Sequence, residues 1–160
     1  MIIVGIDPGL SGAVCLYSTI SGDIDVWDMP TVEVLRSGKK KRELNINLLA
    51  KRLEICGSTS CAVFLERVGA MPGQGVSSTF AFGRNVGIIE GIVGARVAPI
   101  TIVPPQTWQK AMNVRGGKDG ARLRATELFP KHADLFARVK DDGRADATLI
   151  AKYGASMLQK

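Results

Sequence analysis

The feature that most restricts the fold is an apolar run, Ile2–Ile6, that stops at an acid, Asp7, and the turn-forming pair Pro8 and Gly9. Short apolar runs bounded by turn residues are typical of strands buried in a sheet. A carboxylate at the end of such a strand must be solvated, paired or bound to a metal, because an unpaired buried charge is costly. Asp7 therefore predicts a polar site at one edge of a sheet.

The other patterns along the chain predict an α/β fold. Apolar or alternating segments predict strands, and segments with helical spacing predict helices. We expect strands over residues 2–6, 13–17, 23–29, 61–66 and 97–104, helices over 44–56, 79–95, 106–112, 120–129 and 145–158, and a loop over 37–43. The first three strands are expected to be antiparallel neighbours. The result is a five-stranded mixed sheet flanked by helices, in a single domain of residues 1–160.

Composition limits the location and the chemistry. The apolar stretches fall short of the ~20 residues that span a membrane, and no secretory signal is visible, so we expect a cytoplasmic protein without membrane contact. Cys15, Cys56 and Cys61 form no CxxC pair and are expected to be reduced and buried. A single histidine, His132, argues against a histidine-based triad or a zinc site.

The net charge of +6 favours a polyanionic partner, nucleic acid first. The cations concentrate in two stretches, Lys39–Arg42 and residues 110–124. The only acid in the second stretch is Asp119. Such runs also occur on ordinary solvated surfaces, and the charge pattern leaves both interpretations open. The cations of the second stretch are Lys110, Arg115, Lys118, Arg122 and Arg124.

Three acids stand where the predicted elements bring them together. Asp7 and Glu66 end two predicted strands, and Asp146 lies on the first turn of the predicted last helix. Functional groups gather at strand ends in open α/β sheets. Carboxylates without histidine or cysteine form a hard-oxygen site that suits Mg²⁺ or Mn²⁺. A pair of such ions can support phosphodiester hydrolysis by activating water and stabilising the leaving oxygen.

Each acid also has a structural alternative. Asp7 could serve only to form the turn that follows the first strand. Glu66 could pair with Arg67 or with a nearby lysine on the surface. Asp146 could simply favour the positive end of a helix.

Four sequence motifs indicate a family, which the spacing of the acids alone does not. The segments "IIVGIDPGLSGAV", "VFLERV", "FAFGRNVGIIEGIV" and "GRADATLIAKYG" resemble, in this order, the motifs of RuvC-type Holliday junction resolvases of the RNase H-like superfamily. The similarity extends with gaps from Met1 to about Gly154, and "PPQTWQKAMN" is more similar to phage or prophage members. The resemblance implies an RNase H-like fold, a bacterial cell or phage-infected host, and a Mg²⁺-dependent homodimer that resolves four-way DNA junctions by paired hydrolytic nicks.

The resemblance also implies which residues hold the metal. It places the family's carboxylates on Asp7, Glu66 and Asp146, and the fourth position on Gly143, which has no side chain that could bind an ion. Asp142 is the preferred substitute, because it shares a helix face with Asp146. The alternatives are that Asp141 is the fourth ligand or that the site has only three. Either Asp141 or Asp142 could instead cap the last helix.

DNA contacts are implied for two regions and expected for a third. Lys110 and Lys118 match basic residues near the scissile phosphate, and Lys118 is taken as catalytic. The loop after Glu66 occupies a DNA-contacting position in the family, but Met71 is its only large apolar residue where the family often has an aromatic wedge. The expected DNA-binding residues are Lys39, Lys40, Lys41, Arg67, Lys110, Arg115 and Lys118.

A glycine stripe and two rival functions remain open. Gly83, Gly87 and Gly91 recur every fourth residue of a predicted helix, which suits either the family's dimer interface or tight packing on its own sheet. A ribosomal RNA-processing nuclease of the YqgF type shares the opening motif. A non-catalytic protein that binds branched DNA is the other alternative, although acids facing phosphate would not help it.

Overall fold

The computed structural model describes residues 1–36, 38–57, 60–69, 73 and 75–159, with the side chain of Lys118 excepted. Within these residues, no helix has the length and apolar character needed to cross a membrane.

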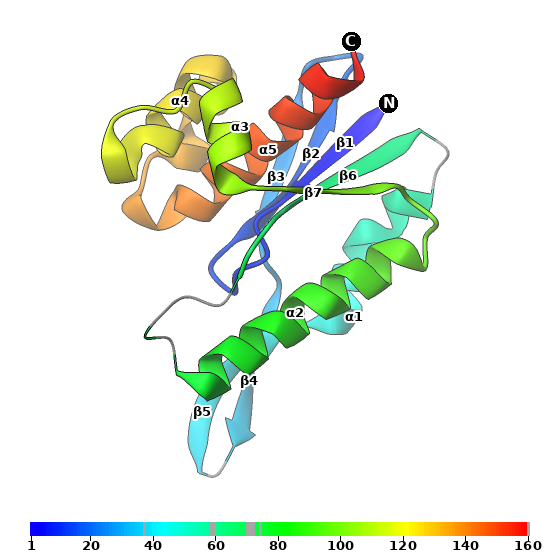
Figure 1. The fold of residues 1–160 in the computed structure, drawn as a ribbon, viewed down its shortest axis with the longest axis vertical. Coiled ribbons are helices and arrows are strands. Elements are labelled where there is room, and N and C mark those ends of the chain that lie inside the picture. Colours follow the sequence, from blue (N-terminus) through cyan, green and yellow to red (C-terminus); the bar gives the residue numbers. More distant parts are fainter. Residues whose placement is uncertain (37, 58–59, 70–72, 74, 160) are drawn as a thin grey trace.

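A mixed sheet forms the centre of the fold. Its strands are β1 (Ile2–Ile6), β2 (Ala13–Ser18), β3 (Ile24–Asp28), β6 (Cys61–Glu66) and β7 (Ile100–Val103). The five strands lie in the order β3-β2-β1-β6-β7 (Figure 1). The first three are antiparallel neighbours, whereas β6 is parallel to β1 and β7 is parallel to β6. The predicted five-stranded mixed sheet is therefore confirmed.

Helices cover both faces of this sheet (Figure 1). They are α1 (Ile46–Arg52), α2 (Val76–Gly94), α3 (Pro105–Ala111), α4 (Gly120–Leu128) and α5 (Asp142–Leu158). Short 3₁₀ turns occupy Leu53–Gly57, Gly117–Asp119, Pro130–Phe136 and Val139–Asp141. Alternation along the strands builds two cores: Ile3 packs with Leu149 of α5, and Val4 packs with Ile89 of α2 on the other face.

The backbone of α5 lies directly against β1. A Cβ atom on Gly5 would come within 2.1 Å of the carbonyl oxygen of Ala147 and 2.4 Å of the backbone nitrogen of Ala151. Only glycine permits this approach, which fixes the start of α5 over the end of β1. Farther along α5, a Cβ on Gly154 would fall 2.4 Å from the ring of Phe64.

The structure corrects the predicted loop over residues 37–43. Lys39–Leu44 forms strand β5, which pairs antiparallel with β4 (Thr31–Arg36) in a separate two-stranded hairpin. Lysine disfavours strands, which is why the sequence pattern suggested a loop. Here the cross-strand ion pairs Lys40–Glu33 and Arg36–Glu43 join the two strands.

Two further boundaries differ from the prediction. α5 begins at Asp142 rather than at residue 145, so Asp146 lies one turn inside the helix and not in its first turn. The last strand is limited to Ile100–Val103, because Val97 adopts a positive φ of 57° in the turn before it.

The glycine stripe of α2 does not pack on its own sheet. Apart from the adjoining backbone of α2 itself, no atom of the described residues lies within 4 Å of a Cβ built on Gly83, Gly87 or Gly91. Packing against the sheet, one of the two alternatives for this stripe, is therefore wrong. Nearby on the same helix, Val76 and Phe80 are 87% and 75% exposed.

Candidate active site

Asp7 and Glu66 lie side by side at the edge of the sheet where β1 and β6 end. The parallel register pairs Ile6 with Leu65, so the next residue on each strand is one of the two acids. Ile6 and Leu65 belong to the core on the α2 side. Because successive side chains alternate between faces, Asp7 and Glu66 point to the face that α5 covers.

Asp7 forms the turn after β1 and also belongs to the candidate site, and its sequence context suggested both roles. Its Oδ1 accepts a hydrogen bond from the backbone N–H of Gly9 at 3.1 Å, which forms the turn after β1. Burial nevertheless raises the pKa of the Asp7 carboxyl, and the Gly9 hydrogen bond offsets this only in part. Forming the turn therefore does not satisfy this carboxylate.

Glu66 is oriented by a tryptophan and not by a cation. The indole Nε1 of Trp108, a fully buried residue of α3, donates to Glu66 Oε1 at 3.0 Å. Burial raises the pKa of Glu66, the Trp108 hydrogen bond lowers it, and the charge of Asp7 raises it again. No ion pair of Glu66 with Arg67 or with a lysine occurs among the described residues.

Asp146 completes the group from α5. Burial, together with the charges of Asp7, Glu66 and Asp142, raises the pKa of Asp146 to about 8. All four carboxylates are therefore close enough to interact electrically. In the absence of a cation, Asp146 keeps its proton at neutral pH.

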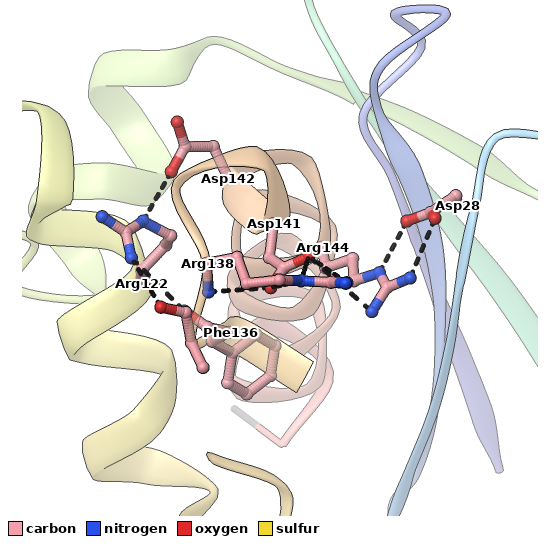
Figure 2. Close-up of polar contacts among 8 residues, drawn as sticks. Asp28, Arg122, Phe136, Arg138, Asp141, Asp142 and Arg144 are labelled. Carbon is pink, nitrogen blue, oxygen red and sulfur yellow. Dashed lines mark hydrogen bonds and ion pairs between the residues drawn. The ribbon is translucent and has the colours of Figure 1, made fainter. Parts of the chain in front are cut away.

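Asp142 lies beside Asp146 and is held by an arginine. Both acids line one cavity of about 490 Å³, together with Gln109, Val114, Ala121 and the Arg115–Gly117 segment. Arg122 Nε lies 2.8 Å from Asp142 Oδ1, and both atoms are buried without a directed hydrogen bond (Figure 2). The Asp142 side chain is half exposed, which leaves its second oxygen accessible.

Asp141 has a different role. It is 1% exposed, and its carboxylate accepts hydrogen bonds from the backbone N–H of Arg138 at 2.9 Å and from Arg138 Nη2 at 2.8 Å. These bonds hold the pKa of Asp141 below its usual range. Arg144 reaches Asp141 at 3.8 Å and binds Asp28, at the end of β3, through two hydrogen bonds of 2.6 and 2.8 Å (Figure 2). Asp141 thus belongs to the network that fixes the start of α5.

Gly143 explains why the family's fourth acid is missing at this position. A Cβ on Gly143 would come within 2.6 Å of the carbonyl oxygen of Ser11, 2.7 Å of the Cα of Gly12 and 3.0 Å of Asp7 Oδ2. The first turn of α5 therefore packs backbone to backbone on the turn that carries Asp7. No side chain fits between them.

The donor set fits a hard divalent cation in its chemistry. All four candidate ligands are carboxylates, which Mg²⁺ and Mn²⁺ prefer. A cation among them would offset the burial and the repulsion that raise the pKa of Asp146. Among the described residues, no three His, Cys, Asp or Glu side chains converge closely enough to form a preassembled metal site.

Comparison with known proteins finds similarity to a curated protein and to solved structures. The chloroplastic Holliday junction resolvase MOC1 of Chlamydomonas reinhardtii is 24% identical over 148 residues, which cover 80% of this chain and 17% of that protein. Thermus thermophilus RuvC in complex with a Holliday junction substrate superposes with a TM-score of 0.63 at 16% identity, covering 98% of this chain and 96% of that chain. A second T. thermophilus RuvC structure gives a TM-score of 0.56 at 17% identity, with the same coverage. No family model matches the chain.

The chain has the RNase H-like fold of RuvC. The resemblance to RuvC-type resolvases that its motifs suggested is thereby confirmed. The chain spans about a sixth of the length of its curated relative, 17%, whereas it spans nearly all of RuvC.

The three predicted DNA-binding residues of the second basic stretch, two of which were expected near the scissile phosphate (Lys110 and Lys118), are distributed unevenly in this RuvC-like fold. Arg115 shares the cavity of Asp142 and Asp146. Lys110 is on α3 and lines a separate shallow groove with Gln106 and Thr107. The backbone of Lys118 lies in the 3₁₀ turn Gly117–Asp119 beside the cavity, and its side chain is outside the described residues.

The other predicted DNA contacts lie at the periphery. Arg67 is exposed immediately after β6, and Lys39, Lys40 and Lys41 are exposed on β5. Met71 lies outside the described residues. Two arginines of the basic stretch are occupied within the protein: Arg122 pairs with Asp119 and Asp142, and Arg124 binds Glu127 and the carbonyl oxygen of Met112.

Sequence reasoning missed two residues that position the acids. Trp108 orients Glu66, and Arg122 holds Asp142. The only sequence signal for Trp108 was its place in a predicted helix after the last strand. Arg122 gave a misleading signal, because it lies in a basic run that resembles a solvated surface, yet its side chain is 13% exposed.

The raised pKa of Asp146 predicts that the Asp146→Asn variant is more stable than the wild type without metal. In the unfolded chain this carboxyl titrates near pH ~4, whereas in the fold it titrates at about 8. Wild-type stability should therefore fall as pH rises through this interval and level off above it. Melting temperatures in EDTA should show Asp146→Asn gaining on the wild type with rising pH. A difference of equal size at pH ~3, where this carboxyl is largely protonated in both the folded and the unfolded chain, would instead indicate a packing effect.

Proposed function

We propose that this protein is a divalent-metal-dependent endonuclease that cuts four-way DNA junctions by paired hydrolytic nicks. The observation that carries the proposal is a group of four carboxylates, in which the charges of Asp7, Glu66 and Asp142 act on the partly buried Asp146. Their all-oxygen chemistry supports metal-assisted phosphodiester hydrolysis. The RuvC-like fold and the similarity to a chloroplastic Holliday junction resolvase support junction DNA as the substrate.

In this proposal each acid has a stated role. Asp7, Glu66 and Asp146 bind the Mg²⁺ ions, and Asp142 contributes its accessible oxygen as the fourth ligand. When bound, the ions would polarise the scissile phosphate and lower the pKa of an attacking water. Trp108 and Arg122 are positioning residues, since each holds a carboxylate that would contact the metal. Arg115 would contact the phosphate backbone at the same cavity, and Lys118 would stabilise charge in the transition state.

The proposal includes a homodimer, with the bare glycine face of α2 as its interface. This face has no packing partner among the described residues, and Val68, Phe82, Val86 and Glu90 line a groove of about 230 Å³ beside it. Glycine inside a helix costs ~1 kcal/mol relative to alanine, so three on one exposed face need a compensating contact. A dimer would present two sites to opposing strands of a junction with matching symmetry.

Replacing Asp7, Glu66 or Asp146 should stop the cleavage of junction DNA without stopping its binding. A labelled four-way junction should be cut by the wild type with Mg²⁺ but not with EDTA. Asp7→Asn, Glu66→Gln and Asp146→Asn should each abolish cleavage and keep or improve junction binding, because repulsion between carboxylate and phosphate decreases. Denaturing gels measure the cleavage, and gel shifts in EDTA measure the binding.

A structured RNA and a linear duplex of equal length serve as comparison substrates in the same assay. Preferential cleavage of the RNA would replace the proposal with an RNA-processing nuclease. Junction binding without Mg²⁺-dependent cutting by the wild type would indicate a non-catalytic binding protein. Wild-type cleavage rates in all three variants would remove these acids from the site.

The fourth ligand predicts a change in metal requirement. Asp142→Asn keeps an oxygen beside Arg122 but removes the charge that would bind Mg²⁺. The Mg²⁺ concentration for half-maximal cleavage should therefore rise, while the melting temperature in EDTA changes little. Asp141→Asn is the matched control: it weakens the contact with Arg138 and should lower the melting temperature without raising the Mg²⁺ requirement. An unchanged requirement in Asp142→Asn would leave a site of three carboxylates.

If the protein is a dimer through α2, Gly87→Ala should stabilise the helix but weaken the dimer. Nothing lies within 4 Å of a Cβ on Gly87, so Gly87→Ala should stabilise an isolated α2 by ~0.5–1 kcal/mol. If helices of two subunits meet there, the added methyl group should instead weaken the dimer, and Gly87→Arg should give a monomer. Sedimentation velocity over a concentration series measures both variants. Leu123→Arg, on the exposed side of α4, is the control and should not change the mass. A monomeric wild type would refute the interface.

A further inference from the structure

The β4–β5 hairpin projects from the body of the protein (Figure 1). Its two strands contact each other far more than they contact any other element. Leu44 at its base is buried, whereas Val32 and Leu35 are 42% and 72% exposed. An isolated two-stranded hairpin is only marginally stable, and this one adds little to either core. Its place in the molecule therefore needs a reason other than packing.

The charges of the hairpin are arranged asymmetrically. Residues 31–44 hold five cations and two acids, and each acid is paired, Glu33 with Lys40 and Glu43 with Arg36. Lys39, Lys41 and Arg42 are left without an acidic partner among the described residues. Directly opposed residues share a face, so Lys39 and Lys41 lie together, opposite Arg36 and Val34. One face of the ribbon thus carries two unpaired lysines.

The hairpin begins at the edge of the sheet that carries the acids. β3 runs in the same direction as β1, because each is antiparallel to β2, so both end at this edge. The base of the hairpin is tied to the turn after Asp7: Arg42 Nη2 donates to Ser11 Oγ at 2.8 Å. From the base pair of Thr31 and Leu44, the six paired positions of the ribbon extend over ~20 Å, at ~3.3 Å per residue.

We propose that the β4–β5 hairpin binds the phosphate backbone of a duplex arm of the junction, which deepens and rests on the proposed nuclease function. The ribbon starts beside the cutting site and points away from it, so its lysines face DNA that leaves the junction. Its length of ~20 Å corresponds to ~6 base pairs at ~3.4 Å each. The contact is with backbone charge, since lysine acts as a point charge on phosphate.

Salt dependence of binding tests this contact. Junction affinity is measured in EDTA for the wild type and for Lys39→Ala/Lys41→Ala. Loss of two phosphate contacts should lower the slope of log K against log salt by ~1.8. The affinity ratio of wild type to variant should then shrink by ~12-fold between ~0.05 and ~0.2 M salt. Lys51→Ala/Lys131→Ala removes the same net charge from exposed positions outside the hairpin and should leave the slope unchanged.

Varying the length of the duplex arms tests where on the junction the hairpin binds. The same measurement is made on junctions whose arms have ~15 base pairs and on junctions with loop-closed arms of ~4 base pairs, which span ~14 Å and end short of Lys39, five residues or ~17 Å from the base of the ribbon. The hairpin variant should bind the long-armed junction more weakly than the wild type, and its loss of affinity should be smaller on the short-armed junction. Any of three results would overturn the inference: an equal loss of affinity on both junctions, an equal loss of affinity in the Lys51/Lys131 control, or no loss of affinity at all. Wild-type cleavage of the long-armed junction, measured separately with Mg²⁺, tests the nuclease function whatever the hairpin does.

Discussion

The partial burial of Asp146 beside three other carboxylates is the constraint on which the rest of this structure depends. Burial and neighbouring charge raise the pKa of Asp146 to about 8, so the group is held together at an energetic cost. The fold meets this cost by rigid backbone packing: α5 rests on β1 at Gly5, and its first turn rests on the loop after β1 at Gly143. Arg144 adds a two-point bond to Asp28. None of these contacts uses a carboxylate of the site, so all four acids remain available.

The same packing accounts for the missing acid at Gly143. With backbone atoms 2.6 and 2.7 Å from a would-be Cβ, a side chain there would push α5 away from Asp7. An acid one residue earlier, Asp142, avoids that contact and still faces the cavity of Asp146. Arg122 then binds one oxygen of Asp142, which reduces the added repulsion and directs the other oxygen outward. Under the proposed function, Asp142 would thus supply the fourth acid without disturbing the close packing at Gly143.

The sequence predicted those parts of the fold that depend on local pattern. Apolar runs located the strands, and alternation placed Asp7 and Glu66 on one face, because the period of a strand is fixed by its backbone. The hairpin was missed because its lysines disfavour strands individually, and only their cross-strand partners compensate. Arg122 was misread for a related reason: its acids lie nearby in space but only one of them, Asp119, lies nearby in the sequence. Pairings between distant residues are not visible in any local pattern.

Under the proposed function, the arrangement of charge would separate holding DNA from cutting it. The net charge of +6 would attract DNA, yet the acids at the sheet edge repel the phosphate that must approach them. A cation next to the acids can be neutralised, as Arg122 is by Asp119 and Asp142. Under the proposed function, Arg115 would meet phosphate at the cavity itself, whereas the unpaired lysines of β5 would meet DNA away from the acids, on a ribbon anchored beside Asp7 through Arg42 and Ser11. Attraction at that distance can bring a duplex to the edge of the sheet, whereas close approach of the phosphate requires a cation between it and the acids.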